Sequence, residues 1–284
     1  MKKLAVVLIG WHYPSQPYNN LVNQIVPDGW AIDYFVIAHR HPKYAVNEKK
    51  TNNLSELDNV LYRQDVTYEM LNSLGWVYHQ SKSGNEWEGA NVFLSNHDYN
   101  EYDCILFAGD DMLVLNDRLF SDIIESKIQL VTNENINGVW TPIRKECKFD
   151  DWLILSNTVH NGRQAIRGSF EFFKPEMIKL LGGKLPLHQD VLNLSIKLNS
   201  NKDTPKNSFN ILSDYNKQFW LLMEIINKNR LYSKVKFMSE YYRVSDYIIE
   251  AERGLISNNK TPYSHLVTQK INQLILENKL ENIL

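Results

Sequence analysis

Two adjacent carboxylates, Asp110 and Asp111, are the residues best placed to do chemistry, because they follow an apolar run at residues 104–108 with only Gly109 between. The run predicts a buried β-strand. Like charges beside buried apolar side chains are unfavourable unless a positive group lies next to them. Carboxylate oxygens are the ligands that Mg²⁺ and Mn²⁺ prefer. The pair therefore predicts a divalent-cation site, and the alternative is a turn, since Gly109 and aspartate both favour turns.

The elements that must position this pair alternate between strand and helix. Continuous apolar runs at residues 4–10 and 31–38 predict two further buried strands. Apolar residues at helical spacing in 21–26 predict a helix between them, and residues 86–96 predict another before the strand at 104–108, after a loop at 79–85. Strand–helix–strand order implies a parallel sheet, whose ligands gather at the carboxyl ends of the strands.

The second half of the chain has a more mixed pattern. Apolar periodicity, together with proline and glycine at the segment ends, predicts helices and short strands there. The predicted strands are 138–143 and 234–238, and the predicted helices are 175–182, 190–198, 215–227 and a tail from residue 266.

Composition limits the class of protein. The chain has 284 residues, is 43% hydrophobic and carries a net charge of −2, which suits one compact unit and argues against a disordered chain or an extended polyanion-binding surface. Two cysteines, Cys104 and Cys147, give neither a disulfide framework nor a zinc motif, so a reducing, cytoplasmic compartment is predicted. The apolar run Leu4–Ile9 is too short for a membrane span.

No GxGxxG, GxxxxGK[ST], HExxH or GxSxG motif is present, so a dinucleotide-binding enzyme, a P-loop enzyme, a zinc protease and a serine hydrolase are all disfavoured. A cation held by Asp110 and Asp111 would then be the obvious phosphate holder.

From Gly75 to Leu115 the chain resembles the nucleotide-sugar-binding half of GT-A fold glycosyltransferases, broadly the family-two-like group. A Gly-Asn loop and a short helix precede a strand that ends in a DxD-like motif, here Asp110–Asp111–Met112. The resemblance implies a metal held by Asp110 and Asp111. It also implies a nucleotide pocket at the ends of the first two strands and the acidic motif, formed by Gly10, Trp11, His12, His39, Arg40 and Asp110.

A second stretch, Arg167–Leu198, extends the resemblance with Gly168, the Gly182–Gly183 turn and Gln189–Asp190. Asp190 matches the general base of inverting members, which takes the proton of an acceptor hydroxyl. The alternative is that Asp190 caps the helix that follows it. His160 and His188 are candidate third metal ligands, and Arg243 and Arg253 are candidate diphosphate ligands.

The implied fold is an α/β, GT-A type Rossmann-like mixed sheet with flanking helices and a C-terminal helical extension. Residues 1–130 would form the nucleotide-sugar-binding half and residues 131–284 the acceptor-binding half of one unit. The implied function is a metal-dependent, inverting glycosyltransferase that uses Mn²⁺ or Mg²⁺. Its partners would be a nucleotide-diphosphate sugar and a saccharide or lipid-linked glycan acceptor.

Two alternatives stay open. The first is a phage-type enzyme that glycosylates a hydroxylated pyrimidine in DNA, for which a basic groove is needed. Candidate groove residues are Lys49, Lys50, Arg144, Lys145, Lys234 and Lys236. The second is a non-catalytic module that binds a sugar nucleotide or glycan. Met112 and Gln189, which replace acidic residues of the family pattern, favour this second alternative.

Overall fold

A computed structural model describes most of the chain. The described residues are 1–10, 15–38, 66–81, 86–110, 112–157, 159–160, 163–164, 166, 170–187, 190, 217–238 and 245–250. The predicted helices at 190–198 and beyond residue 266 therefore lie almost entirely outside them. None of the helices in these ranges has the length and apolar character that a membrane span requires.

Seven strands of the described chain form one mixed sheet in the order β12-β8-β11-β4-β1-β2-β3. All of its strand pairs are parallel except those made by β11, which runs antiparallel to both β4 and β8. The strands are β1 (Lys2–Gly10), β2 (Trp30–Ala38), β3 (Trp76–Gln80), β4 (Cys104–Gly109), β8 (Ile154–Ser156), β11 (Phe170–Phe173) and β12 (Val235–Phe237). Both predicted halves of the chain contribute strands to this sheet, and the predicted α/β class is confirmed.

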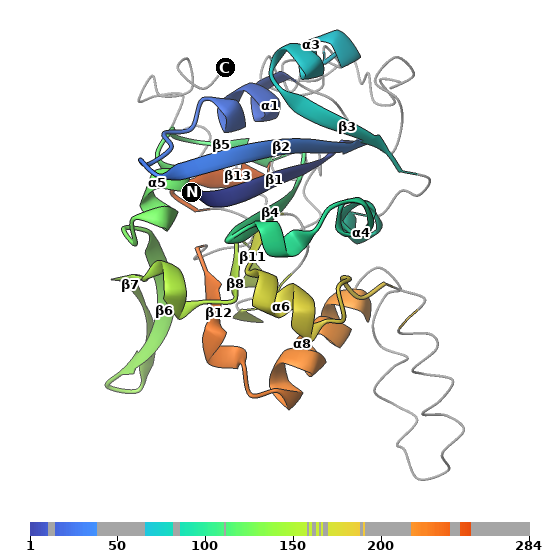
Figure 1. Cartoon of the computed structure of the whole chain (residues 1–284). Coiled ribbons are helices and arrows are strands. Elements are labelled where there is room, and N and C mark those ends of the chain that lie inside the picture. Colours follow the sequence, from blue (N-terminus) through green and yellow to red (C-terminus); the bar gives the residue numbers. More distant parts are fainter. Residues whose placement is uncertain are drawn as a thin grey trace, which may run out of the picture.

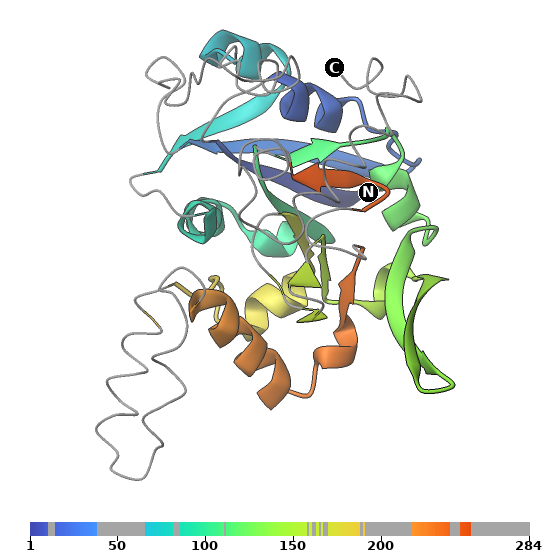
Figure 2. The same cartoon turned by 180° about the vertical axis from the view of Figure 1, so that it is seen from behind.

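Helices cover both faces of the sheet (Figures 1 and 2). One face packs against α1 (Ser15–Val22), α3 (Tyr68–Ser73) and α5 (Leu119–Ile124). The other face packs against α4 (Glu86–Asn96), α6 (Pro175–Leu180) and α8 (Lys217–Lys228). Because every residue from Leu4 to Gly10 is buried on one face or the other, the strand needs an unbroken apolar run rather than alternation.

Smaller strands and short helical turns lie outside this seven-stranded sheet. Strands β6 (Gln129–Ile136) and β7 (Val139–Glu146) form an antiparallel hairpin that projects from the body (Figure 1). Strand β5 (Met112–Val114) pairs with β13 (Ile248–Glu250), so the chain near residue 250 returns to lie beside the acidic motif. Short elements join these parts: η2 (Tyr99–Glu101), η3 (Phe149–Asp151), β9 (Val159–His160), β10 (Arg163–Gln164) and η5 (Tyr232–Lys234).

Three predictions of local structure need correction. The first helix ends at Val22, and Ile25 and Val26 are 48% and 38% exposed beyond it, so their helical spacing was accidental. The predicted loop at 79–85 begins too early, because β3 runs to Gln80 and pairs with β2. The predicted strand at 138–143 is half of the longer β6–β7 hairpin, whose reversal at Asn137 and Gly138 uses positive φ angles at both residues.

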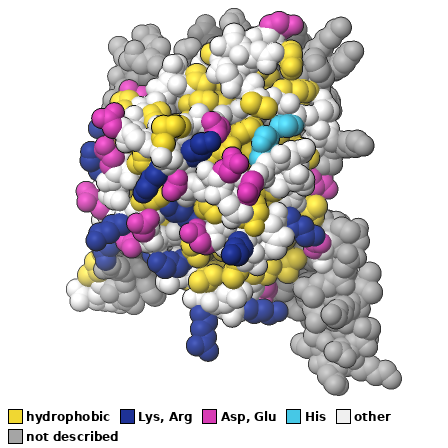
Figure 3. Space-filling model, viewed as in Figure 1, with side chains coloured by type: hydrophobic (Ala, Val, Ile, Leu, Met, Phe, Trp, Pro, Cys, Tyr) yellow, Lys and Arg dark blue, Asp and Glu magenta, His cyan; other side chains and the backbone are white. Residues whose placement is uncertain are grey.

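Two histidines meet on the face covered by α4. The Nε2 atoms of His79, on β3, and His97, just after α4, are 2.8 Å apart, and the His97 ring stacks on Phe93. Figure 3 shows histidine side chains at the surface of this face, close to acidic groups. Burial lowers the pKa of both histidines, and the neighbouring His79 lowers that of His97 further. One hydrogen can be shared between the two nitrogens, whereas two imidazolium ions would repel each other.

This pair predicts a pH-dependent stability. Below the ordinary histidine pKa of 6.5 the unfolded chain binds protons that the folded pair resists, so folding free energy is lost as the pH falls. Thermal melts between pH 7.5 and 5.5, values chosen to bracket roughly one unit on either side of that pKa, should give a shallower slope for His97→Phe than for the native chain. The phenyl ring keeps the contact with Phe93 but cannot titrate. Equal slopes would contradict the assignment.

Candidate functional site

The central feature of the site is the carboxylate of Asp110. Its residue directly follows β4 and is 1% exposed, and its backbone N–H donates to the carbonyl oxygen of Ile9 at 3.2 Å. Because β1 and β4 are parallel neighbours, this bond places Asp110 beside Gly10, at the carboxyl edge of the sheet. The structure thus brings together two of the predicted nucleotide-binding residues.

The side chain of Asp110 points to the face covered by α1. Ala108 and Met112, which alternate with it along the chain, both belong to the core on that face. The Tyr18 hydroxyl, on α1, donates to Oδ2 of Asp110 at 3.4 Å, and Tyr18 is itself fully buried against Trp76. A buried carboxylate at a strand end, in contact with a neutral hydroxyl, suits a site that also receives a cation.

The other members of the predicted pocket cannot be placed. Five of them lie outside the described residues: Trp11, His12, His39, Arg40 and Asp111. The same holds for His188, Arg243 and Arg253, and His160 is described only as part of β9. The DNA-groove candidates Lys49 and Lys50 are also outside, while Arg144 forms an ion pair with Asp246.

Asp190 is held by its own loop. Its Oδ2 accepts from the backbone N–H of Leu187 at 2.9 Å, and its Oδ1 lies 3.4 Å from Nζ of Lys184. A carboxylate that accepts the N–H three residues earlier makes the second half of a capping box. This differs from the predicted N-cap, which would accept from N–H groups of the helix that follows Asp190, and those groups lie outside the described residues. Leu185 in this loop is bound through its backbone to Asn91 of α4, so the loop lies on the α4 side of the sheet. Asp190 therefore has a structural role, and its side chain still keeps about a third of its surface exposed.

A second buried carboxylate, Glu171 on β11, was not predicted. It is 1% exposed, and Oγ of Ser156 on β8 donates to its Oε1 at 3.3 Å. Glu171 alternates with Phe170 and Phe172, whose side chains lie on the α1 face, so its own side chain faces α4 and α8. The sequence signal for Glu171 is a single acidic residue inside the otherwise apolar run 170–173. Tyr18 was also not predicted, and the sequence signal for it is its helical spacing of three residues from Leu21, which places both side chains on the same helix face.

The Asp110 carboxylate could serve as one of the oxygen ligands of a divalent cation. Mg²⁺ and Mn²⁺ sites use one or two carboxylates and complete their coordination with water and substrate phosphates. Asp110 supplies one such carboxylate. Within the described residues, no group of three or more histidine, cysteine or acidic side chains is arranged to hold a metal ion. The remaining ligands would have to come from Asp111, water and the substrate.

Comparisons with known proteins give structural matches alone. No family model matches the chain, and no curated protein matches it. The crystal structure of S. aureus TarS is similar with a TM-score of 0.42 and 14% identity, over 89% of this chain and 61% of that chain. Streptococcus pneumoniae GlyE, described as a glycosyltransferase, gives 0.41 and 10%, over 99% of this chain and 53% of that one.

A Drosophila beta1,4-galactosyltransferase 7 variant, solved with manganese, UDP-Gal and xylobiose, gives a TM-score of 0.37 and 10% identity, over 94% of this chain and 79% of that chain. This chain spans less than two thirds of the TarS and GlyE chains. Because each of these TM-scores is below 0.5, the matches define neither a family nor an activity for this chain.

The contact between Tyr18 and Asp110 can be tested directly. Tyr18→Phe removes the hydroxyl and leaves the ring packed against Trp76, so the buried carboxylate loses one donor. We expect the free energy of unfolding to fall by about 1 kcal/mol, because the bond is long and its donor is neutral. Urea unfolding of the two proteins measures this. An unchanged midpoint would show that the hydroxyl does not stabilise the carboxylate.

Proposed function

We propose that the protein is a glycosyltransferase that moves a sugar from a nucleotide-diphosphate sugar to an acceptor hydroxyl, with inversion at the anomeric carbon. The observation that carries this proposal is the buried Asp110 carboxylate beside Gly10, at the carboxyl edge of the central parallel strands. This edge is where open α/β sheets bind their ligands. The resemblance of residues 75–115 and 167–198 to GT-A fold glycosyltransferases supplies the reaction class.

In this proposal the chain's own residues bind and orient the donor. The ends of β1 and β2, with Gly10 and the residues that follow each strand, receive the nucleoside. Asp110 and Asp111 would hold Mn²⁺ or Mg²⁺, which when bound neutralises charge on the leaving diphosphate. Burial shields the Asp110 carboxylate from bulk solvent, and the contacts with Tyr18 and with the backbone of Ile9 fix its position.

The acceptor enters from the other half of the site. Asp190, on the loop bound to α4, takes the proton from the acceptor hydroxyl as that oxygen attacks the anomeric carbon. Its present contacts with Leu187 and Lys184 would orient the carboxylate while part of its surface stays open to an acceptor. A saccharide or lipid-linked glycan is the proposed acceptor, and no feature of the described residues favours DNA.

Metal-dependent donor binding is the first test. With Mn²⁺ and a nucleoside diphosphate at about 100 times its dissociation constant, the native chain should be stabilised by about 2.7 kcal/mol, visible in a thermal melt. Asp110→Asn keeps the size of the side chain but removes the charge, so this shift should disappear. Asp28→Asn, at an exposed position, is the matched control and should retain it. The same melt on Asp111→Ala tests the second ligand.

If no nucleoside diphosphate shifts the melting temperature of the native chain, the proposal is wrong. Binding that shifts the melt without any release of nucleoside diphosphate in the presence of acceptors would instead favour the non-catalytic binding module.

The base assignment needs a separate measurement. Asp190→Asn keeps an oxygen that can accept from the Leu187 N–H, so stability should change little. Loss of the base should lower turnover by about 10²- to 10⁴-fold while donor binding is preserved. Initial rates of nucleoside diphosphate release measure this, with Lys184→Met as the control for the ion pair. Turnover within a few-fold of the native rate would assign Asp190 to the loop alone.

A further inference from the structure

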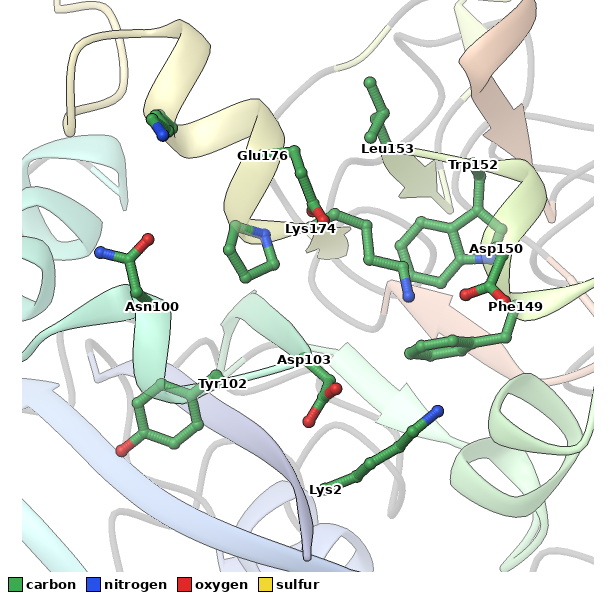
Figure 4. A pocket seen from close by; sticks show the side chains of 12 residues that line it. Lys2, Asn100, Tyr102, Asp103, Phe149, Asp150, Trp152, Leu153, Lys174 and Glu176 are labelled. Atoms are coloured by element: carbon green, nitrogen blue, oxygen red, sulfur yellow. The ribbon is translucent and has the colours of Figure 1, made fainter.

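A cavity of about 540 Å³ opens at the amino edge of the sheet, at the opposite end of the strands from Asp110 (Figure 4). Its walls come from the starts of β1 and β4, from the short elements η2 and η3, and from the segment that follows β11. They include Lys2 at the start of β1, Asp103 before β4, and Lys174 directly after β11. The volume lies within the range typical of small-molecule sites.

This cavity is separate from the proposed donor site. The six residues of β4 lie between Asp103 and Asp110, which at about 3.3 Å per residue places the two edges about 20 Å apart. Lys174 reaches the amino edge because β11 runs antiparallel to β4. A ligand here would contact none of the residues assigned to donor binding.

Lys174 is the unusual group in the cavity. It is only 6% exposed, and its Nζ lies 2.8 Å from the ring centroid of Phe149 and 4.7 Å from that of Trp152. Within the described residues it forms no ion pair with a carboxylate. Burial lowers the pKa of Lys174 to about 8, against the opposing effect of nearby acidic groups, so the ammonium form still prevails at pH 7. A desolvated ammonium that no carboxylate of the described residues contacts directly is costly, and an anion placed against it would stabilise it.

The other polar groups define what that anion should carry. The indole N–H of Trp152 is buried and has no hydrogen-bond acceptor among the described residues. Asp150 and Glu176 are exposed acceptors near the cavity mouth, while Asp103 already accepts from the backbone N–H of Lys3 at 2.8 Å. The lining therefore places the buried ammonium of Lys174 among carboxylates. It contains three lysines, Lys2, Lys174 and Lys179, and three acidic residues, Asp103, Asp150 and Glu176. The equal numbers of lysines and acidic residues disfavour a polyanion, whereas the buried ammonium of Lys174 favours one anionic group, and the carboxylates can accept from hydroxyl donors on the same ligand.

We propose that the amino-edge cavity binds a small hydroxyl-bearing organic anion. Its carboxylate or phosphate lies against the ammonium of Lys174, and its hydroxyls donate to Asp150 and Glu176 at the mouth. Charge-assisted hydrogen bonds of this kind are about twice as strong as neutral ones, so the anionic group is the main determinant of affinity. The inference rests on the cavity alone and does not depend on the glycosyltransferase proposal.

Isothermal titration of the full chain at pH 7 with EDTA tests the proposal. Gluconate carries one carboxylate and several hydroxyls, and glucitol is its neutral counterpart. Glycerol phosphate and glycerol form the equivalent pair for a phosphate group. At least one anion should bind, and its neutral counterpart should bind about tenfold more weakly or not at all. The anion that binds more tightly identifies the source as a carboxylate or a phosphate ester.

Variants then locate the binding. Lys174→Met keeps the apolar stem and removes the ammonium, so the fold should remain stable and affinity should fall about tenfold or more. Lys228→Met, an exposed lysine at the end of α8, and Asp110→Asn should both bind as the native chain does. Binding of neither anion to the native chain would overturn the proposal, as would equal affinities of the native chain and Lys174→Met. Loss of binding in Asp110→Asn alone would place the anion at the other edge.

Discussion

The burial of β1 and β4 on both faces is the constraint on which the rest of the structure depends. Their residues from Leu4 to Ile9 and from Cys104 to Ala108 are between 0% and 4% exposed, so neither face can carry polar chemistry. Helices must cover both faces, and each crossover between parallel strands supplies one. What remains for chemistry is the two edges where the strands begin and end. Asp110 at one edge and Lys174 at the other are both charged groups that sit where an apolar strand stops.

The same constraint explains how much of the fold could be predicted from the sequence. Continuous apolar runs gave β1, β2 and β4, and the predicted helix at residues 86–96 coincides with α4. Strand β3 was missed because its outward-facing residues, such as Val77 at 46% exposed, do not follow the pattern of a fully buried strand. Pairings such as β5 with β13 join segments more than 130 residues apart, and no local pattern encodes such a contact.

The residues of the candidate site also divide into those that the sequence could predict and those that it could not. Asp110 was predictable because a carboxylate next to a buried strand conflicts with its surroundings, and such conflicts mark functional positions. Tyr18, which contacts Asp110, and the buried Glu171 could not be predicted as site residues. An aromatic residue in a helix and a single acidic residue in a strand both have ordinary structural explanations. Asp190 illustrates the reverse case. Its sequence position suggested either a base or the N-cap of the following helix, whereas the contact that its geometry displays is with the N–H of Leu187, three residues before it. This contact is compatible with the proposed base role, because a carboxylate has further lone pairs that can accept a proton.

The reversed direction of β11 has consequences at both edges. A parallel strand in this position would have carried Lys174 to the carboxyl edge, beside the proposed diphosphate site, where an ammonium would compete with a divalent cation for the same carboxylates. Because β11 is antiparallel, its first residue pairs with Ala108 near the donor edge and its last with Ile105 near the cavity. The strand is buried throughout, at 0% or 1% exposure, and is held on both sides by β4 and β8. Lys174, directly after this buried strand, is thereby kept about 20 Å away from the proposed donor site, where its charge is available to the proposed anion.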